Sequence, residues 1–333
     1  MQWCPKFQTL RRIINVTTGF VKAKLGGLTA EPVAPPAASS RLLTITGFGD
    51  NPGRLGMLGH VPPRVAGSPL VVLLHGCGQD AARFAEESGW IGLADRLGFP
   101  LILPEQVEAN NRGRCFQWFQ PSDTARDLGE AGSIAAMTRF AIRQFGSDPK
   151  KVFVVGLSAG GAMAAALLAA YPDLFTAGAS VAGLPVGTAR SALQAMRRMA
   201  SAEPEGGQET WAAQVRASAP AEFAGPWPRL SIWHGQADKT VAPANGDRLA
   251  AQWRALHGLT APTVAEQSIN GVRHRMWPDG AQNLVEQWSL PDLAHAYPVG
   301  TPVVTSARFV ALTRTDATAG IARFFGLTET AGR

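Results

Sequence analysis

Residues 151–172 read KVFVVGLSAGGAMAAALLAAYP and contain an abrupt change of pattern. After Lys151 come apolar residues that are mostly β-branched or aromatic, as in a buried strand, and after Gly160 come small apolar residues, as in a buried helix. The turn GLSAG, residues 156–160, separates the two. A serine on such a sharp turn has strained backbone and needs small neighbours, which Gly156 and Gly160 supply. The segment therefore predicts a strand, a nucleophile elbow that exposes the hydroxyl of Ser158, and a helix.

The pattern on both sides of this segment alternates between strands and helices. A continuous apolar run, typical of a strand covered on both faces, occupies residues 69–75. Further strands are expected at residues 99–103, 177–182 and 229–234. Strand patterns also occur at residues 42–48 and 54–61, which we expect to pair antiparallel, and at 264–269 and 284–290, on either side of a turn. Helical patterns occupy residues 81–97, 128–145, 244–257 and 306–325. This alternation predicts an α/β fold with a mostly parallel central sheet and helices on both faces.

The chain divides by composition into a short N-terminal part and one large domain. Residues 1–40 form a basic extension that ends in the Pro-, Ala- and Ser-rich sequence AEPVAPPAASS, which is typical of a linker. Residues 41–333 are expected to form the catalytic domain. Within it, residues 184–228 interrupt the alternation of strands and helices, and we expect them to form a helical insertion over the sheet.

Charge and cysteine content exclude several classes of protein. The 333 residues are 46% hydrophobic, which is enough for a sizeable core, and carry a net charge of +6. Five basic residues precede the first acidic residue, Glu31, and subtracting those five from +6 leaves +1 for residues 31–333. The main domain is therefore close to neutral, and nucleic acid is not an expected partner. The three cysteines have neither the number of a disulfide framework nor the spacing of a metal site, so no metal is expected.

The N-terminal extension has two open interpretations. Its apolar runs are far shorter than the ~18 residues of a membrane span, and basic residues interrupt any secretory signal, so the cytoplasm is favoured over secretion. Leu10, Ile13 and Ile14 lie among basic residues in a weakly amphipathic pattern. The segment is either an extension against the domain or a helix that binds a membrane or a polymer granule. In the second case, the whole protein could act as a surface-binding protein with the large domain as a scaffold.

The ends of the later strands supply partners for Ser158. A serine hydroxyl needs a base within hydrogen-bonding reach, and the base needs a carboxylate to orient it. In an open parallel sheet the reacting groups gather at the carboxyl ends of the strands. Asp238 follows the strand at 229–234, and His295 follows the strand that ends at Leu290. We therefore predict a catalytic triad of Ser158, Asp238 and His295, in the chain order expected for this type of sheet.

Other histidines and carboxylates are weaker candidates. His274 lies between two arginines in the expected turn 271–280 and is interpreted as a solvated turn residue. Three further histidines are expected to be structural: His60, His234 and His257. For the acid, Asp247 falls inside the following helix, and Asp292 is too close in sequence to His295.

Acyl transfer also requires hydrogen-bond donors for the developing oxyanion. The residue after the nucleophile, Ala159, is expected to offer one backbone N–H. Cys77, in the loop after the strand at 69–75, is best placed to offer the second. Cys77 could instead act as a thiol nucleophile, but Ser158 has the better setting.

Ten short blocks occur in the order found in one family of esterases. They are HGCGQ at 75–79, SGW at 88–90, LADRLGF at 93–99, PEQ at 104–106, CFQWF at 115–119, GEAGSI at 129–134, VFVVGLSAGGAMAA at 152–165, AGLPVG at 182–187, HGQAD at 234–238 and AHAYP at 294–298. With these blocks, residues 41–326 resemble the polyhydroxybutyrate depolymerase family, grouped with the short-chain-length polyhydroxyalkanoate depolymerases. The resemblance implies an α/β-hydrolase fold, Ser158, Asp238 and His295 as the triad, Cys77 and Ala159 as oxyanion donors, and no cofactor.

Departures from the family's pattern bear on the substrate. The block that is usually GHAW is Ala294–Tyr297 here, AHAY, and Gln117 stands where the family commonly has Asn. We expect no polymer-binding module after the domain, and we therefore expect the substrates to be short 3-hydroxybutyrate-type esters or oligomers. Related carbohydrate esterases, which remove acetyl or feruloyl groups from xylan, use similar blocks and are the alternative.

Four residues of these blocks carry further expectations. Trp118 could line an acyl pocket or be a core aromatic residue, and Gln79 is expected to contact the substrate. Cys77 and Cys115 both fall in blocks near the expected site, and a disulfide between them is a hypothesis.

Overall fold

The computed structural model describes residues 42–63, 65–202, 208–259, 265–300 and 309–327. The chain divides into two units, Met1–Pro36 and Ala37–Arg333. The first unit lies outside the described residues. The basic extension, its binding to a surface and the domain boundary near residue 40 therefore stay predictions.

The second unit contains a ten-stranded sheet whose central strands are parallel. From one edge to the other, the strands are β1 (Leu43–Thr44), β2 (Gly56–His60), β4 (Leu101–Glu105), β3 (Leu70–Leu74), β5 (Val152–Leu157), β6 (Ala177–Val181), β7 (Arg229–Gly235), β10 (Gln282–Leu290), β9 (Val272–Asp279) and β8 (Ala265–Ile269). The pairs from β4 to β10 are parallel, whereas the edge pairs on both sides are antiparallel. The mostly parallel sheet predicted from the sequence is thus confirmed.

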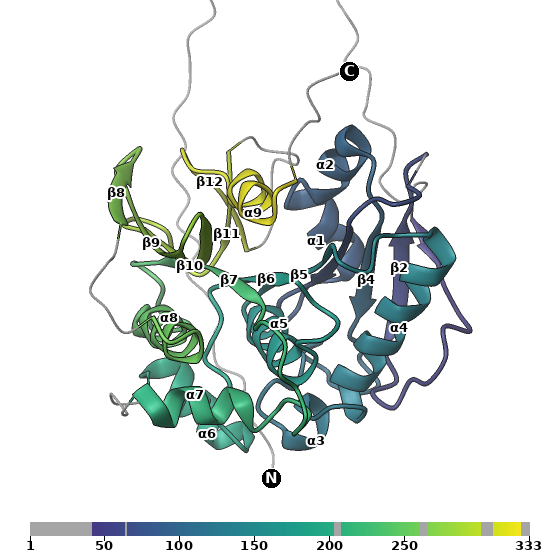
Figure 1. Ribbon diagram of the computed structural model, residues 1–333, viewed down its shortest axis with the longest axis horizontal. Helices are drawn as coiled ribbons and strands as arrows, with labels where there is room; N and C mark the ends of the chain where they lie inside the picture. Colours follow the sequence, from purple (N-terminus) through teal and green to yellow (C-terminus); the bar gives the residue numbers. More distant parts are fainter. Residues whose placement is uncertain (1–41, 64, 203–207, 260–264, 301–308, 328–333) are drawn as a thin grey trace, which may run out of the picture. The chain divides into compact units, whose positions relative to one another are not determined.

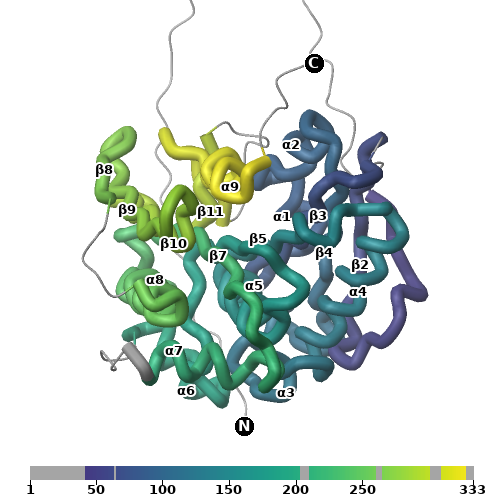
Figure 2. The backbone as a smooth tube through the Cα atoms, in the orientation of Figure 1, coloured from purple at the N-terminus to yellow at the C-terminus, as the bar shows by residue number. Residues whose placement is uncertain are grey.

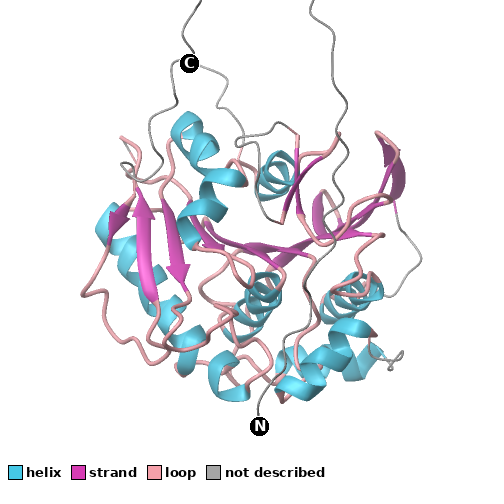
Figure 3. Ribbon diagram, turned by 180° about the vertical axis from the view of Figure 1, so that it is seen from behind, coloured by secondary structure: helices cyan, strands magenta, loops and turns pink. Residues whose placement is uncertain are grey.

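Helices cover both faces of this sheet (Figures 1 and 3). One face is covered by α1 (Ala81–Glu87), α2 (Trp90–Leu97) and α9 (Ala317–Phe325), and the other by α4 (Gly129–Phe145), α5 (Ala159–Ala170) and α8 (Ala244–Leu256). Successive side chains of a strand point to opposite faces, so Val71 and Leu73 pack in one core, while Val72 and Leu74 pack in the other. Because both faces are covered, these strands are continuously apolar.

The expected insertion at 184–228 does contain helices, α6 (Ala192–Ala200) and α7 (Gln208–Arg216). Helix α7 contacts α5 and α8, which are distant from each other in the sequence. In Figure 2 the insertion lies on the same side of the sheet as α5 and α8. A short helix, α3 (Pro121–Thr124), lies in the long loop that follows β4.

The sequence interpretation was wrong about the turn at 271–280. These residues include β9, which pairs with both β8 and β10. His274 is buried in this strand rather than solvated, and its Nε2 lies 2.9 Å from Glu286 Oε2. Arg275, its neighbour, donates to both Asp247 and Gln287. His274 and Arg275 are therefore paired with side chains of β10 and α8.

Two predicted helices have different limits in the structure. The helix expected at 81–97 is divided into α1 and α2 because Gly89 adopts a left-handed conformation, with φ of 80°. The last helix begins at Ala317, and β12 (Val310–Leu312) precedes it and pairs with β11 (Tyr297–Val299); residues 301–308 lie outside the described part. In the described ranges, no helix has the length and apolar character to cross a membrane.

Candidate active site

Ser158 lies on a strained turn between β5 and α5. Its φ of 57° and ψ of −118° are unusual for a residue with a side chain. Glycines make the turn possible: a Cβ on Gly156 would overlap the Gly160 carbonyl, and a Cβ on Gly160 would lie 2.6 Å from the His75 carbonyl oxygen. The α5 helix can therefore begin directly against the ends of β5 and β3. This close approach places Ser158 at the carboxyl edge of the sheet, where the residue is 8% exposed.

Three segments that are distant in the sequence bring Ser158, Asp238 and His295 together. His295 Nε2 lies 2.9 Å from Ser158 Oγ, and His295 Nδ1 lies 2.7 Å from Asp238 Oδ2. A carboxylate can only accept, so the ring hydrogen is on Nδ1 and is donated to Asp238. This tautomer leaves Nε2 free to accept the hydrogen of the Ser158 hydroxyl.

Asp238 is buried and held by several donors. Its Oδ1 accepts hydrogen bonds from the backbone N–H groups of Thr240 at 2.8 Å and Val241 at 2.9 Å. His234 Nε2 donates to the Val241 carbonyl at 3.0 Å and lies 3.4 Å from Asp238 Oδ2. Burial alone would raise the pKa of Asp238, but the hydrogen bonds from His234, His295 and Val241 outweigh burial and hold it below its usual range. Asp238 therefore remains a carboxylate facing His295 throughout the neutral range.

The loop after β3 lies against the elbow. A Cβ on Gly76 would lie 3.5 Å from both Cγ and the carbonyl oxygen of Leu157, the residue before Ser158. Gln79 is buried, and its Oε1 accepts the Gly76 N–H at 2.8 Å. Gln79 thus closes this loop, and a direct contact with substrate stays a prediction.

Two backbone N–H groups near Ser158 are available as donors. Ala159 is the first residue of α5, so its N–H has no acceptor within the helix. Within the described part of the chain, neither this N–H nor that of Cys77 donates a hydrogen bond. Cys77 and Cys115 form a disulfide, which confirms the hypothesis made from the sequence.

A cavity of about 700 Å³ lies along α5, and Trp118 forms part of its wall. Trp118 is half-buried and packs against a small apolar cluster that includes Ala162 and Val241. The Ala162 N–H donates to the Ser158 carbonyl at 2.9 Å, so this part of the wall is one helical turn from the serine. Further wall residues are Pro121, Ala166, Pro185, Val186, Ala189, Arg190, Ala213 and Gln214.

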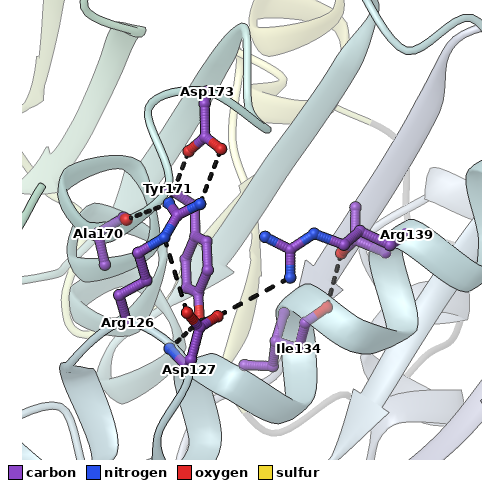
Figure 4. A network of polar contacts seen from close by, with 8 residues as sticks. Arg126, Asp127, Ile134, Arg139, Ala170, Tyr171 and Asp173 are labelled. Carbon is purple, nitrogen blue, oxygen red and sulfur yellow. Dashed lines mark hydrogen bonds and ion pairs between the residues drawn. The ribbon is translucent and has the colours of Figure 1, made fainter. Parts of the chain in front are cut away.

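Arg126, another residue of this wall, is neutralised by neighbours (Figure 4). Its guanidinium donates to both carboxylate oxygens of Asp173, at 2.7 and 2.8 Å, and lies 4.7 Å from the centre of the Tyr171 ring. Arg126 also donates to the Ala170 carbonyl, at the end of α5. The Tyr171 hydroxyl accepts the Asp127 N–H at 2.6 Å. These contacts anchor the segment after α3 to the end of α5, so Arg126 is a structural part of the wall.

The sequence interpretation missed a buried network beside the Cys77 loop. His75, Gln106 and Glu130 are each at most 2% exposed. The Gln106 N–H donates to His75 Nε2 at 3.1 Å, and Gln106 Nε2 donates to Glu130 Oε1 at 2.5 Å. All three residues belong to the blocks HGCGQ, PEQ and GEAGSI. Their presence in these blocks was the one available signal, because no local pattern indicates that they bond to one another.

The remaining candidate histidines have structural partners, as expected. His60 Nε2 lies 2.7 Å from Asp95 Oδ1, and His257 Nε2 lies 3.2 Å from the Pro228 carbonyl oxygen. Asp247, the rejected candidate for the acid, accepts hydrogen bonds from Arg275 and Gln287.

Comparisons with known proteins identify related esterases. Residues 58–276 match the family model described as Esterase PHB depolymerase. A poly(3-hydroxyalkanoate) depolymerase C of Paucimonas lemoignei is 37% identical over 277 residues, which are 82% of this chain and 66% of the relative. A feruloyl esterase B of Talaromyces stipitatus is 30% identical over 282 residues, 81% of this chain and 76% of the relative.

A solved structure confirms the α/β-hydrolase fold. An acetyl xylan esterase from Aspergillus awamori superposes with a TM-score of 0.73 and 26% identity. The superposition covers 86% of this chain and 99% of the esterase. The sheet and its covering helices are thus shared with an esterase over nearly its whole length.

Proposed function

Because the chain belongs to the Esterase PHB depolymerase family of carboxylic ester hydrolases, we propose that it cleaves esters through an acyl-enzyme on Ser158. The observation that carries the proposal is the pair of short contacts from His295, 2.9 Å to Ser158 Oγ and 2.7 Å to Asp238 Oδ2. These contacts supply a base beside the hydroxyl and a carboxylate that orients the base.

The proposed reaction has two halves. Ser158 Oγ attacks the ester carbonyl carbon while His295 Nε2 takes the hydroxyl proton. The backbone N–H groups of Cys77 and Ala159 donate to the oxyanion, and His295 then returns the proton to the leaving alcohol. Water gives a proton to the same nitrogen and attacks the acyl carbon, the bond to Ser158 Oγ breaks as the acid is released, and His295 returns the proton to Ser158 Oγ. Asp238 holds the imidazole and stabilises its positive charge in both halves.

We propose short-chain hydroxyalkanoate esters or oligomers, of the 3-hydroxybutyrate type, as substrates. The similarity to a poly(3-hydroxyalkanoate) depolymerase over 82% of this chain supports this class. The cavity beside Trp118 supports it as well, because alanine, proline and valine form much of its wall, and short aliphatic chains pack well against such surfaces. Binding of a polymer granule or membrane through the N-terminal extension is a separate proposal.

The alternative substrate class is an acetyl or feruloyl ester on a xylan-type sugar. The superposition on 99% of an acetyl xylan esterase favours it, as does the similarity to a feruloyl esterase. The chemistry at Ser158 is the same for both classes.

One assay tests both the mechanism and the substrate. We expect Ser158→Ala to leave at most ~10⁻³ of the wild-type turnover, because loss of the nucleophile disables the whole triad. Ser268→Ala, an exposed serine on the edge strand β8, is the matched control and should keep full activity. Turnover of Ser158→Ala near that of the wild type would contradict the proposed nucleophile.

The substrate class is tested by hydrolysis of soluble 3-hydroxybutyrate oligomers and of acetylated xylo-oligosaccharides at equal ester concentration. Ser158→Ala serves as the blank. A higher kcat/KM for the oligomers is the expected result. A higher value for the acetylated sugars would keep the mechanism and replace the substrate assignment.

A further inference from the structure

His75 lies immediately before the Gly76–Cys77 peptide, and its ring hydrogen can be located from its partners. The backbone N–H of Gln106 points at His75 Nε2 from 3.1 Å. A backbone N–H can only donate, so Nε2 must be an acceptor and the single ring hydrogen of the neutral imidazole is on Nδ1. His75 Nδ1 lies 2.9 Å from the Gly76 carbonyl oxygen and therefore donates to it.

This hydrogen bond, together with a longer one from the Gln79 N–H at 3.2 Å, holds the Gly76 carbonyl and so sets the direction of the next N–H. Peptide units are planar, and among the residues that the structure describes none is cis. In a trans peptide the C=O and N–H point in opposite directions. A Gly76 carbonyl that is held toward the His75 ring therefore turns the Cys77 N–H away from this ring. Because Gly76 packs against Leu157, the same peptide lies beside the elbow that presents Ser158.

We propose that His75 is a positioning residue that aims the Cys77 N–H at the oxyanion, and that Gln106 selects the imidazole tautomer required for this role. The inference rests on the proposed function of Ser158 and Cys77. His75 itself holds the peptide that donates to the oxyanion and takes no part in the proton transfers of His295.

The surroundings of His75 are built to keep this arrangement. Gln106 Nε2 donates to the Cys115 carbonyl at 3.2 Å and to Glu130 Oε1 at 2.5 Å, so one side chain links helix α4 to the disulfide partner of Cys77. The Phe116 ring packs 5.0 Å from the His75 ring. Burial, the largest effect, lowers the pKa of His75 to about 4, so the ring is neutral with one hydrogen at pH 7.

Two amide substitutions separate the two nitrogens of this ring. The amide group of Asn occupies the place of Nδ1 and can donate to the Gly76 carbonyl, so His75→Asn keeps the proposed function of the ring. The amide of Gln reaches the place of Nε2, so His75→Gln keeps a partner for the Gln106 N–H. The Gly76 carbonyl then loses its shorter bond, from His75, and keeps the longer one from the Gln79 N–H at 3.2 Å. With 4-nitrophenyl butyrate, we expect His75→Gln to lower kcat roughly 10²-fold, as for loss of one oxyanion donor. We expect the kcat of His75→Asn with the same substrate to stay within about tenfold of the wild-type value.

Three readouts distinguish positioning from a loss of stability. KM should change little in both variants, because the oxyanion forms only after substrate binding. Affinity for a boronic acid that forms a tetrahedral adduct with Ser158 should fall with kcat. The wild-type ¹⁵N NMR spectrum should show His75 protonated on Nδ1 at pH 7. Equal losses of kcat in the two variants, losses that follow their melting temperatures, or protonation on Nε2 would overturn the inference.

The same experiment keeps the two proposals apart. An active Ser158→Ala variant would contradict the proposed function. An inactive Ser158→Ala variant combined with equal losses in His75→Asn and His75→Gln would contradict only the positioning by His75.

Discussion

The two loops beside Ser158 are held in place by opposite means. The elbow depends on missing side chains: Gly156 and Gly160 have no room for a Cβ because backbone atoms of neighbouring segments occupy the space. The 75–80 loop depends on side chains: His75, Gln79 and the Cys77–Cys115 disulfide hold it. Steric exclusion permits no added atom, whereas a set of bonds can be removed one at a time. A single added Cβ should therefore disrupt the elbow, whereas removal of one bond should weaken the loop only in part.

Gly160→Ala should have the largest effect. The new Cβ would overlap the Leu74 carbonyl oxygen and lie 2.6 Å from that of His75, so the backbone of β3 or α5 must shift. We expect a loss of at least about 3 kcal/mol in the free energy of unfolding, at the upper end of overpacking costs. Urea unfolding followed by circular dichroism measures this loss.

Gly92→Ala is the matched control for this substitution. Gly92 is an exposed residue inside α2, and its Cβ would meet only the end of the Arg96 side chain, 3.6 Å away. Alanine is favoured over glycine in a helix by about 0.5–1 kcal/mol, so this variant should be slightly stabilised. Similar losses in the two variants would show that the packing of the elbow is not the cause.

Removing the disulfide should have an intermediate effect. The bond joins residues 38 positions apart. We expect the double variant Cys77→Ser and Cys115→Ser to lose about 2–3 kcal/mol of stability, in the lower part of the usual range, because the hydrogen bonds of the loop remain. Activity should fall less than in His75→Gln, since the backbone N–H of residue 77 is retained. Thiol titration of the denatured, unreduced wild-type protein should find one thiol, Cys4. Three reactive thiols would contradict the disulfide.

Glu130→Gln should have the smallest net effect at neutral pH, and its pH dependence is informative. Burial, as the dominant cause, raises the pKa of Glu130 to about 8, although hydrogen bonds from Gln117 N–H and Gln106 Nε2 act to lower it. The folded state therefore keeps a proton that the unfolded state releases near its ordinary value of 4.5. The unfolded state binds fewer protons between these values, so this group makes the wild type less stable as pH rises from 4.5 to about 8.

Gln cannot titrate, so the variant should lack this loss of stability. At pH 7 the stability that the variant gains is offset by the loss of one hydrogen bond, because the amide NH2 group cannot accept from an N–H donor. Such a bond is worth about 1 kcal/mol. Urea unfolding of both proteins between pH 5 and pH 8 should show that the free energy of unfolding of the variant rises relative to that of the wild type as pH rises. Parallel curves would indicate that Glu130 is ionised in the folded state.

The parts of the fold that sequence patterns predicted are those with strong local signals. Central strands such as β3 and β5 are covered on both faces, so almost every residue is apolar and the pattern is unmistakable. Strand β9 contains two arginines and a proline, and the sequence interpretation placed it in a turn. Its strand conformation depends on pairing with β10 and on partners such as Glu286 for His274. Such partners are contributed by other segments and leave no trace in the local pattern.

The candidate site divides in the same way. Ser158, Asp238 and His295 could be predicted as neighbours because each follows a recognisable strand, and parallel strands bring their carboxyl ends to one edge. Gln106 was not found, although it belongs to a quoted block, because its function depends on bonds to His75 and Glu130, 31 and 24 residues away. No periodicity in the sequence encodes a hydrogen bond between such distant positions.

The sequence by itself determined the alternation of the central strands with their covering helices, the elbow around Ser158 and the chain order of the residues expected to react with it. These properties follow from hydrophobic periodicity and from the conformational freedom of glycine, both of which act within a few residues. The tertiary structure alone decided the strand at β9, the tautomer of His75 and the direction of the Cys77 N–H. Each of these depends on a donor or acceptor delivered by a distant segment, and hydrogen bonds act only at contact distance.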